Sequence, residues 1–160
     1  MKRLSFLACL FLAPIVAQAQ TVALWRFAEK PAGNAAGSQQ RVMDASGFGN
    51  HGRLIGPAGY VRGSGPDGTA IALDGSGMLE VPDAHAFDFP GDFTIEAMVR
   101  TQKRVGQYIF LRNGPTGEIW IRQHVKSGHD AAIAALIKTG KGLDLIVSGP
   151  RAVVDGKFHH

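Results

Sequence analysis

Short apolar runs, separated by glycine, proline and small polar residues, make up most of the chain. The sequence holds 21 Gly and 8 Pro, and it shows no sustained 3.6-residue apolar period of the kind that marks an amphipathic helix. Candidate strands recur instead at intervals of about 10–15 residues, which is typical of a β-sandwich or barrel. The predicted strands cover residues 22–27, 53–55, 60–62, 70–74, 78–81, 93–100, 107–112, 118–125, 131–138, 143–147 and 151–154.

Three local patterns refine this prediction. Residues 93–100 alternate most clearly, with apolar side chains at the odd positions on one face and the even positions on the other. Residues 70–74 and 78–81 flank Gly75-Ser76-Gly77, which predicts a hairpin with a short loop. Residues 131–138 are rich in alanine and also suit a helix, but their Gly-rich ends and neighbouring strands favour a strand. A one-turn helix fits between Pro82 and Pro90.

The first 19 residues have the pattern of a secretory signal peptide. Lys2 and Arg3 precede an apolar run from residue 4 to residue 16, and Ala17-Gln18-Ala19 offers small residues for cleavage before Gln20. The run is too short to span a bilayer, and Cys9 lies in its middle rather than at the end that a lipoprotein signal requires. We therefore expect a secreted or periplasmic protein, with a mature domain at residues 20–160 and no membrane segment after cleavage.

Charge and cysteine content narrow the class of the mature chain. Lys2 and Arg3 leave with the leader, so 15 basic and 13 acidic residues remain, a net charge of +2. The basic residues are scattered rather than gathered into a stripe, which argues against a nucleic-acid partner. The single cysteine also lies in the leader, so the domain has no disulfide and depends on core burial or a metal.

Several motifs resemble the laminin-G-like members of the concanavalin-A-like lectin and glucanase superfamily. Residues 44–52 are similar to the D-x-S-G-x-G-N-x-G turn of that family, and residues 70–75 to its A-l-x-F-D-G strand. Residues 93–99 are similar to F-T-I-E-A-W-V and residues 155–160 to D-G-x-W-H-H, while Trp25 lies in an opening apolar strand. The resemblance covers nearly all of the mature chain and implies an all-β, two-sheet antiparallel β-sandwich, a jelly roll.

The chain departs from the family pattern at two core positions and at its end. Met98 and Phe158 stand where the family usually has Trp, and both are apolar replacements that a core tolerates. In the family the H-H pair is followed by further strands, so the resemblance implies an incomplete sandwich whose last strands are missing from residues 20–160 and whose sheet edge is open.

The sequence offers little to an enzyme. The glucanases of this superfamily use carboxylates spaced along one strand, as in E-x-D-x-x-E, whereas Glu80, Glu96 and Glu118 each stand alone. The mature chain has no cysteine nucleophile and no G-x-S-x-G. The histidines lack metal-ligand spacing; they are His51, His85, His124, His129, His159 and His160. We expect no catalytic activity, with a degenerate glycosidase as the remaining enzymatic alternative.

Calcium is the cofactor to consider. Many relatives bind it at the sandwich edge, and the turn at residues 44–52 offers the Asp44 carboxylate, the Asn50 amide and several carbonyls. The alternative is an Asx-type turn, in which the two side chains bond their own backbone. Both interpretations remain open at this point.

A carbohydrate site is the family's usual function, and one patch fits it. Trp120, Arg122 and His124 share a face of the predicted strand at residues 118–125. If that strand adjoins residues 93–100, with Arg112 between them, an aromatic and polar patch forms from Glu96, Arg100, Arg112, Trp120, Arg122 and His124. Its basic character suits acidic sugars, although Trp120 as a core residue is the plainer alternative. The sequence thus predicts a secreted module that binds carbohydrate or an extracellular protein, or an adhesion domain without a sugar site.

Overall fold

The computed structural model describes residues 20–37, 39–82, 85–89, 91–114, 117–124, 132–139 and 144–160. These residues form β-strands and one short 3-10 turn, η1 (His85–Phe87), which lies where the one-turn helix was predicted. None of the described residues belongs to a helix of the length and apolar character that crossing a membrane requires. The predicted leader, residues 1–19 with Cys9, lies outside the described residues. The all-β class is therefore confirmed.

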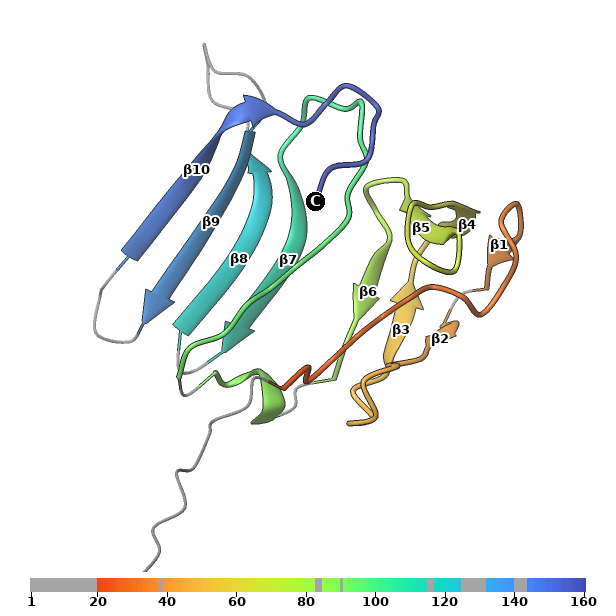
Figure 1. The fold of residues 1–160 in the computed structure, drawn as a ribbon, viewed down its shortest axis with the longest axis horizontal. Coiled ribbons are helices and arrows are strands. Elements are labelled where there is room, and N and C mark those ends of the chain that lie inside the picture. The colour runs from red at the N-terminus through yellow and green to blue at the C-terminus, as the bar shows by residue number, and fades with distance from the viewer. Residues whose placement is uncertain are drawn as a thin grey trace, which may run out of the picture.

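The largest element is a four-stranded antiparallel sheet in the order β10-β9-β8-β7. Its strands follow one another along the chain as a meander, on the left of Figure 1. They are β7 (Gln107–Gly114), β8 (Gly117–His124), β9 (Ala132–Thr139) and β10 (Asp144–Ala152). The alanine-rich segment is thus a strand as predicted. The two short strands expected at 143–147 and 151–154 are joined in β10, with an irregularity between Ser148 and Ala152.

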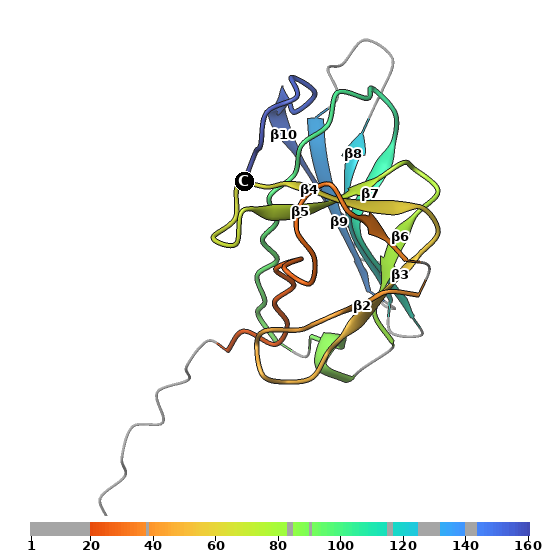
Figure 2. The same ribbon diagram turned by 90° about the vertical axis from the view of Figure 1, so that its right-hand side faces the viewer.

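Two three-stranded antiparallel sheets form the other side of the molecule, on the right of Figure 1 and in front of the large sheet in Figure 2. One has the order β1-β4-β5 and the other β2-β3-β6. Three large side chains from these sheets are almost completely buried: Val42, Leu54 and Tyr60. The strands are β1 (Ala35–Ala36), β2 (Arg41–Val42), β3 (Gly52–Ile55), β4 (Ala58–Arg62), β5 (Thr69–Leu73) and β6 (Met78–Glu80).

The predicted hairpin of residues 70–74 and 78–81 is wrong. β5 pairs with β4, whereas β6 pairs with β3 in the other small sheet. The turn between them redirects the chain, because Asp74 Oδ1 accepts hydrogen bonds from Ser76 N and Oγ and from Gly77 N. Gly77 then lies so close to the β3–β4 corner that a Cβ there would be 2.2 Å from the carbonyl oxygen of Pro57. Two adjacent corners therefore carry the chain from sheet to sheet.

Residues 93–100 run extended (Figure 1) but belong to none of the three sheets that the structure describes, so the strand predicted there is also wrong. Val99 alone forms a bridge, antiparallel with His159. The predicted faces are largely correct: Phe93, Ile95 and Val99 are half-buried, the even positions are exposed, and Ala97 is exposed as well. The predicted opening strand at 22–27 is likewise reduced to a bridge between Trp25 and Asp44. With three sheets described, the two-sheet jelly roll stays a prediction.

Candidate functional site

A bulge in β7 gathers aromatic and basic side chains on one face of the large sheet. Tyr108 pairs with Arg122, and Leu111 pairs with Trp120. Tyr108 and Leu111 are three residues apart in β7, whereas Trp120 and Arg122 are only two residues apart in β8. The extra residue, Ile109, shifts the register there. Directly opposed residues of antiparallel strands share a face. We call the face that carries Tyr108, Leu111, Trp120 and Arg122 the outer face.

Arg122 lies over both aromatic rings of the outer face. Its guanidinium carbon is 4.5 Å from the Trp120 ring centroid and 5.8 Å from that of Tyr108. The two rings meet edge to face with centroids 6.4 Å apart. Trp120 is only 8% exposed, whereas Tyr108 is 53% exposed. The Tyr108 ring is therefore the aromatic surface that a ligand can reach, with the guanidinium beside it.

Arg112 lies on the opposite face of the sheet, because it pairs with Ile119 and alternates with Leu111 and Trp120. Its guanidinium forms an ion pair with Asp88. Gln123 shares this inner face and donates a hydrogen bond to the carbonyl of Lys103 at 2.7 Å. The predicted place of Arg112 in a common patch with Trp120 is therefore wrong.

Glu96 and Arg100 are exposed on the segment of residues 93–100. The segment makes no ladder with β7 or β8, so the adjacency on which the predicted patch depended does not occur. The Arg100 guanidinium instead stacks 4.7 Å from the Phe158 ring centroid. His124 is the last residue of β8, and its side chain lies outside the described part of the structure. Among the described side chains of the predicted patch, Trp120 and Arg122 lie together, and Tyr108 was missed.

The Asp44 turn is organised around a buried carboxylate. Asp44 is 7% exposed, and its Oδ1 accepts hydrogen bonds from Leu24 N and Ser46 N, both at 2.8 Å. Its Oδ2 accepts from Ser46 Oγ at 2.7 Å and from Asn50 N at 2.9 Å. The backbone N–H of Asp44 donates to His51 Nδ1 at 2.9 Å. The carboxylate therefore has donors on both oxygens.

Asn50 ties the same turn to the N-terminal segment. The side-chain amide nitrogen of Asn50 donates to the Val22 carbonyl at 2.7 Å. The backbone carbonyl of Asn50 accepts a hydrogen bond from the Trp25 indole at 2.9 Å. A calcium ion at Asp44 would have to replace N–H and O–H donors that already satisfy the carboxylate. The donor set in this arrangement is that of an Asx-type turn, and calcium stays a prediction that thermal melts with added calcium and with a chelator would test.

The hydrogen bonds at Asp44 make its protonation a matter of stability. Burial alone raises the pKa of this carboxyl, but the hydrogen bonds from Ser46, Leu24 and Asn50 outweigh it and lower the pKa from 3.8 to about 2. A group whose pKa is lower in the folded state than in the unfolded state stabilises the fold at pH values above its unfolded-state pKa. That stabilisation is lost as the pH falls toward the folded-state pKa.

We therefore expect the free energy of unfolding to fall by about 2 kcal/mol between pH 4.5 and pH 2 because of Asp44. Urea denaturation at a series of pH values measures this loss. The Asp44→Asn variant should lack this component of the pH dependence. An unchanged pH dependence in the variant would show that another group is responsible.

Neither a metal-binding cluster nor a similar protein identifies the function of this chain. The described residues contain no cluster of three or more His, Cys, Asp or Glu side chains placed to hold a metal ion. Comparison with protein-family models, with curated proteins and with solved structures gives no match for this chain. The laminin-G-like resemblance therefore rests on the sequence motifs alone.

Proposed function

We propose that this protein is a secreted, non-catalytic binding module of laminin-G-like type, and that it recognises carbohydrate through the outer face of its four-stranded sheet. The observation that carries the proposal is the stack of Arg122 on Trp120 and Tyr108, with Tyr108 half exposed. The leader pattern supports secretion, and the motifs together with the antiparallel sheets support a concanavalin-A-like sandwich.

The outer face has the chemistry that a sugar needs. A pyranose ring packs its C–H face on an aromatic ring, and Tyr108 offers one that is 53% exposed. The Arg122 guanidinium lies beside that ring, and its positive charge there suits the carboxylate or sulfate of an acidic sugar. Trp120 lies beneath the guanidinium and holds it in place. Acidic glycans are therefore the ligand class of this proposal.

A glycan array followed by titration with the best ligand tests the proposal. We expect Tyr108→Ala and Arg122→Ala each to weaken binding about tenfold, because each removes a contact of about 1.4 kcal/mol. Arg62→Ala is the matched control, since Arg62 is an exposed arginine of β4 in a different sheet. Equal binding by the Arg122 and Arg62 variants, or silence of the acidic glycans on the array, would contradict the proposal.

An adhesion domain that binds protein and no sugar is the second candidate. Leu111 is 50% exposed on the outer face, and Val105 just before β7 is 51% exposed. Exposed apolar side chains around an arginine and a tyrosine are also typical of a protein interface. Silence on the glycan array, together with binding to an extracellular protein that Tyr108→Ala abolishes, would favour this candidate.

A further inference from the structure

The outer face carries a second group of polar side chains, toward the opposite end of β8 from Arg122. Glu118 is two residues from Trp120 in β8, so the two side chains share a face. Asn113 of β7 and Lys138 of β9 both pair with Glu118, and directly opposed residues lie on the same face. Asn113 and Lys138 are exposed, and Glu118 is half-buried. We call Asn113, Glu118 and Lys138 the polar end of the outer face.

An apolar stretch separates the polar end from Arg122. Leu111 and Trp120 are opposed there, and Leu111 is 50% exposed. Residues on one face of a strand recur about every 6.8 Å, because each residue advances the strand by about 3.4 Å. The outer face therefore presents three successive positions along β8, which are Arg122 with Tyr108, Trp120 with Leu111, and Glu118 with its polar neighbours.

The opposed charges at the polar end are arranged differently from those of another strand pair. Arg53 and Glu80 are directly opposed across β3 and β6, and they form an ion pair at 2.6 Å. Glu118 and Lys138 are opposed in the same way. Among the described residues, however, no ion pair or hydrogen bond joins either of these side chains to the other or to a third residue. Their carboxylate and ammonium groups can therefore meet a ligand on this face.

We propose that the polar end is a second sugar subsite, and that the ligand of the outer face is an oligosaccharide with an acidic sugar at Arg122 and a neutral sugar at Glu118 and Lys138. This inference rests on the proposed carbohydrate function. A carboxylate accepts hydrogen bonds from sugar hydroxyls, and an ammonium group donates to sugar oxygens. The opposite charges of the two side chains offset each other, so a neutral sugar suits this end better than a second acidic one.

The spacing of the two ends sets the length of the ligand. Arg122 and Glu118 are four residues apart in β8, which corresponds to about 14 Å along the strand. A single sugar ring is much shorter than this distance and cannot contact both ends. Affinity should therefore rise as the chain lengthens, until the ligand reaches the polar end, and change little beyond that length.

Titration calorimetry with hyaluronan fragments of two, four and six sugars tests this length dependence, because acidic and neutral sugars alternate in hyaluronan. Chondroitin sulfate fragments of the same lengths form a second, sulfated series. We expect affinity to rise about tenfold from two to four sugars and to change by less than about threefold from four to six. Equal affinity for two and four sugars in both series would overturn the second subsite, and so would silence of both series.

Variants of the polar end test the same inference at fixed ligand length. We expect Glu118→Ala and Lys138→Ala each to weaken binding of the four-sugar fragment about fivefold, because each removes a polar contact with the ligand. Binding of the two-sugar fragment should stay within about twofold, since that fragment does not reach from Arg122 to the polar end. Thermal melts establish that both variants fold.

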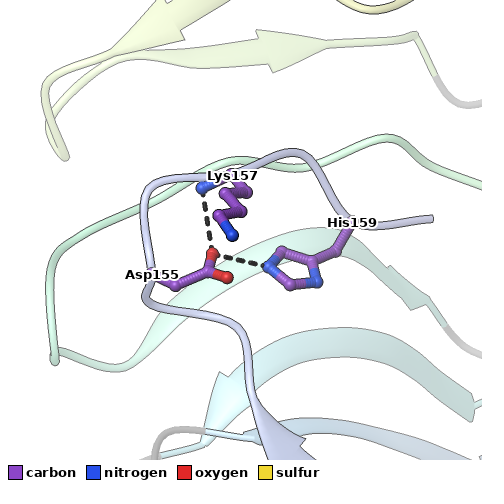
Figure 3. Close-up of polar contacts among 3 residues, drawn as sticks. All are labelled: Asp155, Lys157 and His159. Carbon is purple, nitrogen blue, oxygen red and sulfur yellow. Dashed lines mark hydrogen bonds and ion pairs between the residues drawn. The ribbon is translucent and has the colours of Figure 1, made fainter.

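Lys157→Ala is the matched control for Lys138→Ala. Lys157 is an exposed lysine in the turn after β10. Figure 3 shows it beside Asp155 and His159, where its backbone N–H donates to Asp155 Oδ1 at 2.9 Å. That bond does not involve the lysine side chain and survives the substitution. Equal binding of the four-sugar fragment by the Lys138 and Lys157 variants would overturn the second subsite.

Arg122→Ala separates failure of this inference from failure of the proposed function. If Arg122→Ala loses affinity for both fragment lengths while Glu118→Ala and Lys138→Ala lose affinity for neither, the acidic-sugar site stands and the second subsite is overturned. If Arg122→Ala binds acidic glycans as tightly as the Arg62→Ala control, the proposed function is contradicted and the second subsite falls with it.

Discussion

Replacing Asp44 with alanine is expected to lower the free energy of unfolding by about 3 kcal/mol or more, because several buried donors lose their acceptor at once. The carboxylate accepts from the backbone of Leu24, Ser46 and Asn50 and from the Ser46 hydroxyl. These bonds join the N-terminal segment to the turn, so their loss also releases the bridge between Trp25 and Asp44. Urea denaturation at pH 7 measures the change.

Asp74→Ala is the matched control for this prediction. Asp74 is also the acceptor of an Asx-type turn, through bonds from Ser76 and Gly77, but it is exposed and water can replace it. We expect a much smaller loss of stability in the control than in Asp44→Ala. If the two variants lost equal stability, burial would not be what makes Asp44 important, and the N-terminal segment would not depend on it.

The Asp44 turn also shows what the sequence could and could not predict locally. The glycines and Asn50 indicated a tight turn at residues 44–52, and both an Asx-type turn and a calcium site fitted the residues. The choice depends on donors that are distant in sequence. Leu24 is 20 residues from its acceptor, and the amide of Asn50 bonds to Val22, 28 residues away. A local pattern contains no information on such partners.

Strand positions were more predictable than strand partners. β7, β8 and β9 lie close to the strands predicted at residues 107–112, 118–125 and 131–138, because each pairs with its neighbour in the chain. The expected hairpin at residues 70–81 failed because the Asp74 turn sends the chain into another sheet. Residues 93–99 have a strand's alternation, yet alternation reports which side chains are buried and says nothing about which backbone pairs with them.

The candidate site was predicted in part for a related reason. Trp120 and Arg122 are two residues apart in one strand, so their common face follows from the period of a strand alone. Tyr108 joins them only through the register shift at Ile109. Strict alternation along β7 would have placed Tyr108 on the same face as Phe110, opposite to the face that carries Trp120 and Arg122. Arg112 was assigned to the patch without knowledge of register, which only the three-dimensional pairing supplies.

Leu54→Ala is expected to lower the free energy of unfolding by about 3 kcal/mol, through lost apolar burial and the cavity that remains. Leu54 is fully buried and lies in β3, the central strand of its sheet between β2 and β6. Its backbone bonds to residues on the β2 side, with Leu54 N donating to Gln40 O at 2.8 Å and Gln39 N donating to Leu54 O at 2.9 Å. The residues that surround Leu54 are therefore held by the sheet and are little able to fill the cavity that the truncated side chain leaves.

The control for Leu54 is the same change at Leu73, which is 43% exposed in β5. Leu73→Ala should cost no more than about 1 kcal/mol, because the residue loses little burial and leaves no enclosed cavity. Chemical denaturation of both variants gives the comparison directly. Equal losses would mean that Leu54 is no better packed than an exposed leucine, and that the two small sheets lack the core which Val42, Leu54 and Tyr60 form.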